Sequence, residues 1–446
     1  MFWTSLTIFY TISSSQWVFN LNHAGAMMNF TKLKGRLLSQ ITVQKRLKVV
    51  CLWYLIFLMI SVRKHSLSAA ARFSGLQTSQ FSRFLINHPD VAVYQLNQLS
   101  IKQARQFSSA IEFLSAGQLP WQVAILIDST IQHRFSLHSD NVKRFNHGKG
   151  FQIGHQWTNI VLLINDRLIP LAPIPFYSKS YCRKNRINYK TENTLVVEYI
   201  EKLNLVDYIG EHNPKHVVAL ADSGYDDRKI ENAIRIKKWH FIIALNKGRS
   251  VKSKNSFLST PTYTGWSKVA QFFKDHRKVG WQTIRIILNR SKKKRMEFRI
   301  RLIKGYLRYV GYVLLICSEF KKRPRGRKKY LACSDLKATA RQIVIGYRIR
   351  WSIEIFHKEI KMFLGFEDVA TKWFDSVIAH VHWVYCAYIL LNSGPFDTQV
   401  RAIAEKQRQI SKIVSNREIS RVVQMLTQID GAQRYKNELQ QAIAGT

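Results

Sequence analysis

The sequence predicts a mixed α/β fold in which helices flank a sheet of mixed strand direction. Two short apolar runs, Val123–Ile127 and Val217–Ala221, have the length and composition of buried strands. Phe151–Ile164 and Leu168–Ile174 form a further pair of predicted strands, joined by an Asn-Asp turn. Segments with helical periodicity separate the apolar runs, and this alternation favours an α/β sheet over a β-sandwich or a helical bundle.

The composition indicates a basic protein whose partner carries negative charge. The 446 residues include 69 Lys and Arg against 28 Asp and Glu, a net charge of +41. Such a surplus repels itself in a compact state, so nucleic acid is the first partner to consider. An anionic membrane surface is the alternative. The five cysteines form no CxxC pair, which indicates a reducing compartment and no cysteine metal site.

The N-terminal part of the chain contains two apolar segments. Residues 1–26 carry no Lys or Arg, so a secretory signal fits them poorly, and we interpret them as a candidate over-extended start. Met27 or Met28 is then the alternative initiator. Val49–Val62 is a mostly apolar run of 14 residues, shorter than the ~20 residues that a membrane span needs. A buried helix is therefore expected there, with a membrane anchor as the alternative.

Residues 27–120 are expected to form a helical DNA-binding region. Leu67–Ile86 fits a helix-turn-helix. Ala71 stands four residues before Gly75, and Phe81 stands six residues after it. Ala71 is then the small residue where the helices cross, Gly75 forms the turn, and Phe81 is the apolar residue that packs the second helix on the first. Many unrelated helical hairpins share this spacing, and such a hairpin is the alternative. The side chains expected to face a DNA groove are Gln77, Thr78, Gln80 and Arg83.

The middle of the chain changes from alternating elements to a basic, β-rich stretch. Thr191–Leu205 and Lys229–Lys238 have helical periodicity, and Phe241–Leu245 is predicted to be a strand. Residues 247–335 are dense in Lys and Arg, and within them Lys321–Lys329 is expected to be an exposed loop. The other elements predicted from here on are strands at Thr283–Leu288, Phe298–Ile303 and Tyr309–Cys317, a core helix at Val377–Leu391 and a helical tail over residues 393–446.

The stretch Tyr347–Lys361 is predicted to be a helix with two different faces. Its apolar stripe, with spacings of four and three, consists of Ile349, Ile353, Phe356, Ile360 and Phe363. Four polar residues fall on another side within an arc of roughly 60°. These residues are Tyr347, Arg350, Glu354 and Lys361. An ordinary Arg-Glu pair on a solvated face is the alternative.

Three carboxylates are candidates for a metal site. Asp128 and Asp222 each follow one of the buried apolar runs, which would hold them at the rim of a sheet. Taken singly, a turn role for Asp128 and a helix N-cap for Asp222 are commoner than catalysis. Glu354 lies on a helix whose apolar face can pack along that sheet. Such a set suits two Mg²⁺ ions about 4 Å apart, which assist displacement at a phosphodiester.

These residues resemble the DDE transposases of bacterial insertion sequences, whose catalytic domain has an RNase H-like fold. The family spacing Tyr-x₂-Arg-x₃-Glu-x₆-Lys is matched at all four positions of the Tyr347–Lys361 stretch. The two aspartates follow Ile-Leu-Ile and Ala-Leu-Ala, as in that family. The resemblance implies an RNase H-like catalytic domain over residues 121–246 and 336–392, with a β-rich basic insertion at residues 247–335.

The resemblance implies a transposase that acts on double-stranded DNA. Asp128, Asp222 and Glu354 would bind two Mg²⁺ ions, for which Mn²⁺ can substitute. Cleavage at terminal inverted repeats and joining to target DNA would follow a cut-and-paste route with a hairpin intermediate, in a homodimer on paired ends. The expected location is the bacterial cytoplasm, at the nucleoid, with no membrane partner.

The resemblance also implies which side chains contact DNA. Tyr347, Arg350 and Lys361 would hold phosphates beside the cleavage point. Trp266 and Trp281, chosen only by their place in the insertion, are candidates for holding a flipped base. Packing in the core of a β-domain is the alternative for both. The alternative functions are a structure-specific nuclease of the same fold and a decayed derivative that only binds DNA.

Overall fold

One continuous sheet organises the protein. The computed structural model describes residues 29–146, 150–253, 265–289, 294–320, 328–393 and 402–427. Within these ranges the strands are β1 (Val123–His133), β2 (Lys143–Asn146), β3 (Phe151–Ile164), β4 (Arg167–Pro170), β5 (Ile174–Pro175), β6 (Val217–Ala221), β7 (His240–Leu245), β8 (Ser250–Ser253), β9 (Ser267–Lys268), β10 (Gln282–Asn289), β11 (Lys294–Leu307), β12 (Gly311–Phe320) and β13 (Lys329–Cys333). They pair in the order β2-β3-β1-β6-β7-β13-β12-β11-β8-β9, with β10 on β11 and with β4 and β5 on β3.

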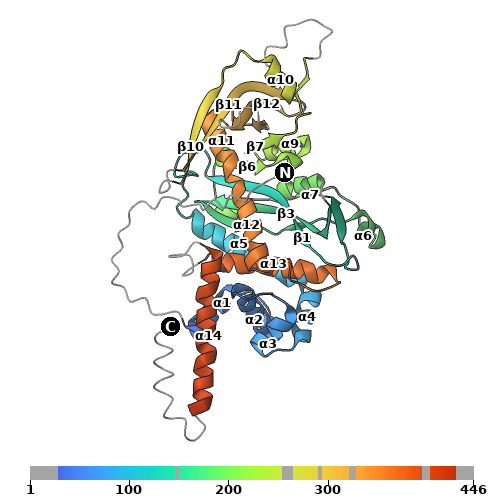
Figure 1. The fold of residues 1–446 in the computed structure, drawn as a ribbon, viewed down its shortest axis with the longest axis vertical. Helices are drawn as coiled ribbons and strands as arrows, with labels where there is room; N and C mark the ends of the chain where they lie inside the picture. Colours follow the sequence, from blue (N-terminus) through green and yellow to red (C-terminus); the bar gives the residue numbers. More distant parts are fainter. Residues whose placement is uncertain are drawn as a thin grey trace, which may run out of the picture.

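Helices cover the sheet and complete the mixed α/β fold that the sequence predicts. In the described ranges they are α1 (Phe30–Gln40), α2 (Lys48–Met59), α3 (Leu67–Ser74), α4 (Thr78–Asn87), α5 (Pro89–Ser108), α6 (Lys179–Lys184), α7 (Glu192–Lys202), α8 (Val206–Ile209), α9 (Arg228–Ile236), α10 (Val269–Asp275), α11 (Ala340–Ile349), α12 (Trp351–Phe363), α13 (Phe374–Leu391) and α14 (Ile403–Thr427). Figure 1 shows α1–α4 and the β10–β12 segment at opposite ends of the molecule.

The alternation of side chains along β1 divides the core into two layers. Ala124 and Leu126 belong to the layer that contains apolar residues of α2, α4, α11, α12 and α13. Val123, Ile125 and Ile127 belong to the other layer, with residues of α7 and α9. A period of two is what an extended strand dictates. Because both faces are buried, the central strands have continuous apolar sequences.

The central strand β1 is longer than its apolar run. β1, β6 and β7 are parallel, whereas β3 runs antiparallel to β1. The sequence predicts a strand that ends at Ile127, but β1 continues through Asp128 to His133, so this predicted end is wrong. The reason is the 14-residue β3, which supplies backbone partners for β1 as far as His133.

The hairpin after β3 has the predicted turn but a shorter second strand. Asn165 and Asp166 have positive φ values of 48° and 58°, as a two-residue hairpin turn requires. The strand predicted for Leu168–Ile174 is wrong, because the structure has two short pieces there, β4 and β5. Pro170 and Pro173 lack the N–H groups that a continuous ladder needs.

The β-rich stretch expected at residues 247–335 extends the central sheet. β13 pairs antiparallel with β7, and β12, β11 and β8 continue outward from it. β10 and β11 include the strands predicted at Thr283–Leu288 and Phe298–Ile303. β12 begins two residues after the predicted start at Tyr309 and continues past the predicted end at Cys317. The helix α10 has no counterpart in the prediction. Of the predicted loop, residues 321–327 lie outside the described residues, and Lys328 and Lys329 are exposed.

The N-terminal helices pack against α13. Eight residues of α2 are buried, so the buried helix expected at Val49–Val62 is confirmed. Tyr54 Oη of α2 lies 2.7 Å from His380 Nδ1 of α13. Among the described helices, α13 is the one long and apolar enough to cross a membrane, and 89% of that stretch is buried inside the protein. In the predicted tail, α14 docks through Gln407, whose Nε2 donates to Phe363 O (2.6 Å).

Candidate active site

Asp128 and Asp222 lie on neighbouring parallel strands at the centre of the sheet. Ile127 of β1 pairs with Ala221 of β6, and the two aspartates are the next residues along. Each carboxylate also accepts a backbone N–H from a residue close by in the sequence, at 3.0 Å and 2.8 Å respectively. Asp222 thereby caps the 3₁₀ turn Ser223–Tyr225, so its N-cap role and its position at the strand end coexist.

Arg350 connects the third predicted carboxylate to the first. Its Nη1 lies 3.5 Å from Asp128 Oδ2, and its Nη2 donates to Glu354 Oε1. The Arg350 side chain is only 8% exposed, so this pairing takes place largely out of water. The charged groups of Asp128, Arg350 and Glu354 therefore form one partly buried cluster.

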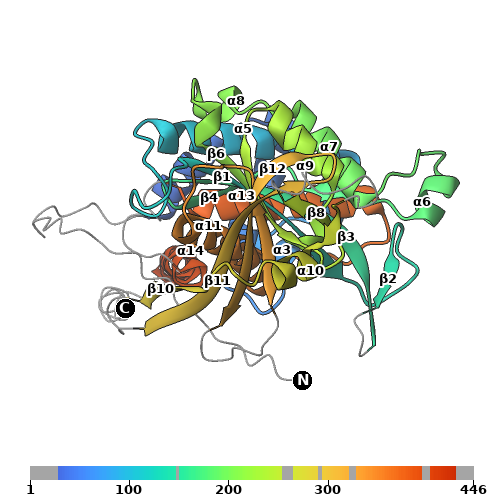
Figure 2. The ribbon, with the colours of Figure 1, turned by 90° about the horizontal axis from the view of Figure 1, so that it is seen from above.

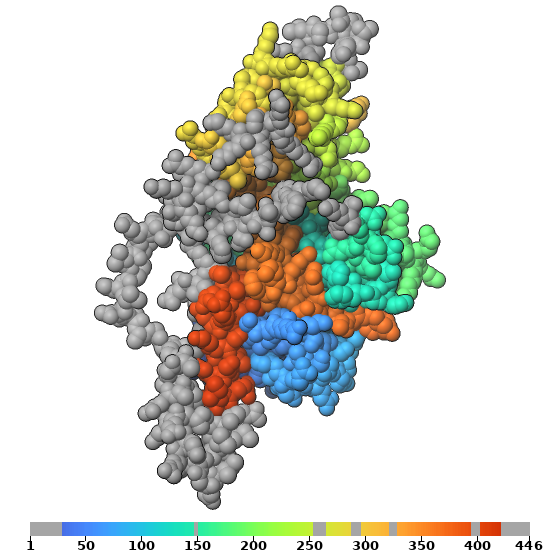
Figure 3. Space-filling view, viewed as in Figure 1, coloured from blue at the N-terminus to red at the C-terminus, as the bar shows by residue number. Residues whose placement is uncertain are grey.

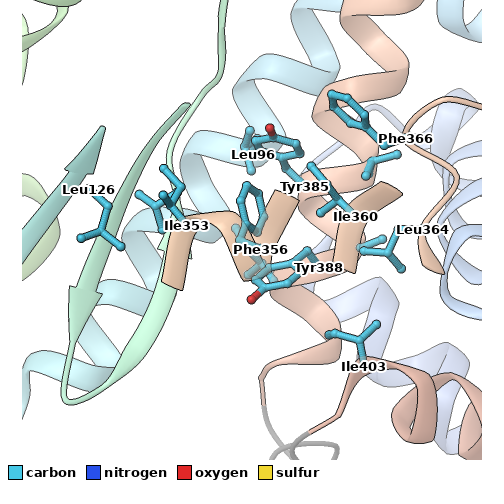
Figure 4. Packing of buried hydrophobic residues seen from close by; sticks show 14 of the residues in the cluster. Leu96, Leu126, Ile353, Phe356, Ile360, Leu364, Phe366, Tyr385, Tyr388 and Ile403 are labelled. Atoms are coloured by element: carbon cyan, nitrogen blue, oxygen red, sulfur yellow. The ribbon is translucent and has the colours of Figure 1, made fainter. Parts of the chain in front are cut away.

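α12 holds Glu354 in place by burying its other side in the core. Ile353, Phe356 and Ile360 of the predicted apolar stripe are fully buried, and Figure 4 shows them between β1 and α13. The prediction of one helix over Tyr347–Lys361 is wrong, because the helix is divided at Arg350 into α11 and α12. At this point Ile353 N donates to Arg350 O (3.1 Å), a tighter 3₁₀-type turn.

The three carboxylates influence one another electrostatically. The pKa of Asp128 is raised to about 7, and burial is the largest cause. The Arg350 cation opposes this rise, whereas the charges of Asp222 and Glu354 add to it. In the part of the chain that the structure describes, no three His, Cys, Asp or Glu side chains already form a metal-binding cluster. The donors are nevertheless all carboxylate oxygens, which hard cations such as Mg²⁺ prefer, and a cation would relieve their repulsion. The residues present therefore fit a divalent metal.

A buried chain of hydrogen-bonded side chains, which the sequence did not predict, ends beside Asp128. Tyr385 Oη donates to Asn159 Oδ1 (2.6 Å), and Asn159 Nδ2 then donates to His357 Nε2 (2.7 Å). The ring proton is thus left on Nδ1, which faces Asp128 Oδ2 at 4.0 Å. Burial lowers the pKa of His357 to about 3, so the ring is neutral. His357 stands three residues after Glu354, and this helical spacing is the signal that could have found it.

A second unforeseen cluster fixes the loop that follows Asp222. Tyr225 Oη donates to Glu192 Oε1 (2.7 Å), which also accepts from Thr158 Oγ1 (2.9 Å). Gln156 Nε2 donates to the other oxygen of Glu192 (2.6 Å). Glu192 therefore ties this loop to β3. Its partners come from two separate segments, both distant from Glu192 in the sequence, so no sequence spacing could have indicated it.

The two remaining signature residues lie beside Arg350 and Glu354 and have neighbours within the protein. Tyr347 is buried, with Lys329 Nζ 4.7 Å from its ring centroid, and its hydroxyl has no hydrogen-bond partner among the described residues. Lys361 Nζ donates to Ile131 O (2.6 Å) and lies 3.5 Å from Glu367 Oε1. Lys361 thus joins α12 to β1 at a point three residues beyond Asp128.

The helix-turn-helix candidate is a helical hairpin that lies apart from the carboxylates. Gly75 has a φ of 75°, as the predicted turn requires, and Phe81 is buried. Ala70 is fully buried, and Ala71, the predicted crossing residue, is partly buried against the same core. Figure 1 places α4 on the far side of α13 from β6. The predicted groove-facing side chains are all exposed, and these are Gln77, Thr78, Gln80 and Arg83.

The two tryptophan candidates are half-buried and are not brought to the carboxylates. Trp281 lies against β11, with the guanidinium carbons of Arg299 and Arg301 at 5.0 Å and 4.6 Å from its ring centroid. Trp266 packs on Tyr306 at 5.9 Å. The strand β11 is four strands from β6 in the sheet, a lateral spacing of about 19 Å at ~4.8 Å per strand.

The mixed sheet with these three carboxylates is consistent with an RNase H-like enzyme that acts on DNA. The model of the family described as "Transposase DDE domain" matches residues 122–390, a range that includes Asp128, Asp222 and Glu354. The chain belongs to this family of transposases. Comparison with curated protein sequences gives no match. Members of the family bind DNA and generally depend on a divalent metal.

Proposed function

We propose that this transposase cuts DNA at the terminal inverted repeats of its own insertion sequence and joins the freed ends to target DNA. The observation that carries the proposal is the convergence of Asp128, Asp222 and Glu354 from β1, the end of β6 and α12. Their mutual repulsion, which contributes to the raised pKa of Asp128, is what a site for divalent cations requires.

The three carboxylates would hold two Mg²⁺ ions, for which Mn²⁺ can substitute. When bound, such ions activate the attacking oxygen and stabilise the leaving oxygen of a phosphodiester. Arg350 and Tyr347 would then bind the phosphate. Arg350 Nε and Tyr347 Oη are buried donors without a hydrogen-bond partner in the described residues, and an unmade bond of this kind costs about 1–3 kcal/mol. A bound phosphate would offer acceptors to donors of this kind, and Lys361 would contact the adjacent phosphate.

The remaining features of the proposal follow from the family resemblance. The route is cut-and-paste with a hairpin intermediate, carried out by a homodimer on paired DNA ends at the bacterial nucleoid. The exposed side chains of α4, among them Gln80 and Arg83, would contribute to recognition of the terminal repeat. Trp281 is favoured over Trp266 for stacking on a flipped base, because its ring has three cations within 6 Å in the described residues, whereas Trp266 has Arg308.

A cleavage and strand-transfer assay on labelled DNA with the element's own ends tests the proposal. Wild type is compared with Glu354→Gln and with Glu359→Gln, a matched change of a half-buried carboxyl on the same helix that hydrogen-bonds Tyr388 instead. Wild type and Glu359→Gln should give hairpin ends and joined products when metal is present and none when it is absent. Glu354→Gln should give neither product under either condition. Cutting without joining would indicate a nuclease. Binding without any cutting in the wild type would indicate a decayed derivative.

A further inference from the structure

A short arm with exposed apolar side chains extends from the sheet beyond Asp128. We call residues 134–146 and 150–153 the β2 arm, since strand β2 lies at its centre. Phe135 is 89% exposed, Phe151 57% and Leu137 53%. Figure 2 shows β2 and the start of β3 projecting from the rest of the sheet. Large apolar side chains exposed together on one short segment indicate a contact surface.

The β2 arm is fixed to the loop that follows the helix of Glu354. Arg134 is buried, and its guanidinium donates to the backbone oxygens of Val369 and Thr371. Asp140 N donates to Lys372 O (2.8 Å). These bonds set the exposed side chains of Lys372 and Trp373 beside the arm, and Figure 3 shows the two segments next to each other on one face. The arm and α12 therefore keep a defined relation.

The charge of the β2 arm is positive. Lys143 and Arg144 are exposed, and the Arg144 guanidinium lies 4.3 Å from the centroid of the Phe151 ring. Among residues 134–190 only Asp140 and Asp166 are acidic. Asp140 pairs with Lys184 (3.4 Å), and Asp166 lies at the other end of β3.

Cations on an edge strand also discourage sheet-to-sheet association. That role accounts for Lys143 and Arg144, but it does not account for the exposure of Phe135, Leu137 and Trp373. Cations interleaved with exposed aromatic rings suit a polyanion that also offers sugar and base surfaces, which is nucleic acid.

We propose that the β2 arm holds the duplex DNA that runs across the active site, on the side beyond the cleavage point. Phe135 follows Asp128 by seven residues of nearly extended chain. The distance between the two residues is therefore at most about 23 Å, at ~3.3 Å per residue. That reach corresponds to about seven base pairs at ~3.4 Å each. The arm's cations contact phosphates, and its apolar side chains lie against sugar edges. This inference rests on the proposed function and adds a DNA contact outside the signature residues.

Binding of labelled duplexes to the full-length protein in EDTA tests the inference without cleavage. One duplex carries the terminal repeat and ends at the cleavage point, and a second extends ~10 base pairs further into flanking DNA. A third duplex of equal length has unrelated sequence and represents target DNA. Lys143→Ala/Arg144→Ala is compared with Phe135→Ala/Trp373→Ala and with Lys202→Ala/Lys215→Ala, a matched control with two exposed cations away from the arm.

Both arm variants should bind the extended or the unrelated duplex about tenfold more weakly, while binding of the truncated duplex and of the control variant stays unchanged. The cation variant should also lower the slope of log affinity against log salt by about 2, one unit for each lost phosphate contact. Loss on the extended duplex identifies flanking DNA as the ligand, and loss on the unrelated duplex identifies target DNA.

Three results would overturn the inference. The first is unchanged affinity of the arm variants for all duplexes. The second is a loss of affinity for the truncated duplex as large as that for the longer ones. The third is a changed oligomeric state of the arm variants without DNA, which would make the arm a protein interface. Failure of the proposed function would be seen separately, because wild type would bind DNA but not cut it when metal is added.

Discussion

At the scale of single residues, the interactions of the site converge on Asp128. Its carboxylate pairs with Arg350, faces the His357 ring and lies next to Asp222 across the sheet. Its pKa of about 7 is above the ordinary value of 3.8, chiefly through burial. The folded protein therefore binds a proton at Asp128 more tightly than the unfolded chain does, so ionisation of this group destabilises the metal-free fold.

The change Asp128→Asn should stabilise the metal-free protein at alkaline pH. Below pH 3.8 the aspartic acid is protonated in both states, so wild type and variant should unfold alike with respect to this group. Between pH 3.8 and about 7 the unfolded chain loses this proton while the folded protein keeps it, so the advantage of the variant grows across this range. Above pH 7 it should reach ~4 kcal/mol in free energy of unfolding, at ~1.4 kcal/mol for each pKa unit. Denaturant unfolding in EDTA at pH 4.5 and pH 8 measures this difference. An equal difference at both pH values would contradict it.

The hydrogen-bonded chain behind Asp128 should matter for activity as well as for stability. Tyr385→Phe removes the donor that orients Asn159 and should cost ~1 kcal/mol of stability and about tenfold in cleavage rate. Tyr388→Phe on the same helix removes a hydroxyl bonded to Glu359 and serves as the control. It should cost similar stability and leave cleavage unchanged. Equal cleavage rates for the two variants would show that the chain is only structural.

The residues of the site differ in how well the sequence alone could find them. Tyr347, Arg350, Glu354 and Lys361 lie on one short segment, so helical spacing is enough to group them. Asp128 and Asp222 are indicated by the apolar runs before them. Glu192 and Asn159 could not be foreseen, because their partners lie on distant segments that meet only in the folded sheet.

At the scale of elements, a buried ion cluster joins α9 to the strand that opens the β-rich stretch. Arg249, next to β8, has Nη1 3.2 Å from Asp226 Oδ1, and its Nη2 donates to Glu231 Oε2. Glu231 is fully buried. Burial raises the pKa of Glu231 to about 7, and Arg249 is the first influence that opposes this rise.

Removing Arg249 should loosen the junction between the central strands and the β-rich stretch. Arg249→Met leaves the Glu231 carboxylate buried without its cation and should lower the free energy of unfolding by about 3–5 kcal/mol. The double variant Arg249→Met/Glu231→Gln should recover part of that loss, because only one of the two carboxylates that Arg249 pairs with, Asp226, then stays charged, and it also accepts from Asn246 N (2.7 Å). Thermal and denaturant unfolding measure both. Equal stability of the two variants would contradict the assigned role of the pair.

Boundaries of elements are where the sequence-based prediction departs from the fold. The apolar run ends at Ile127, but β1 extends to His133 because β3 offers backbone partners there. The division of the Tyr347–Lys361 helix at Arg350 coincides with the pairing of Arg350 to two carboxylates. Both features depend on tertiary partners that local periodicity does not report.

At the scale of the whole molecule, the chain combines a large positive charge with a core that links its N-terminal helices to the catalytic sheet. Residues of α2, α4, α13 and β1 belong to one continuous apolar cluster. The net charge of +41 predicts a polyanionic partner. The charge could be predicted from composition. The packing of α2 and α4 on α13 could not, because it depends on which apolar faces meet.

The proposed function requires that Asp222, with Asp128 and Glu354, holds the metal on which DNA cleavage depends. The most direct measurement is the cleavage rate of Asp222→Cys in Mg²⁺ and in Mn²⁺, with Asp227→Cys, at the N-cap of α9, as the control. A thiolate is a poor ligand for Mg²⁺ and a better one for softer metals. Asp222→Cys should lose about 10²-fold or more in Mg²⁺, and Mn²⁺ should restore part of that rate, while the control stays active in both. Full activity of Asp222→Cys in Mg²⁺ would contradict the claim.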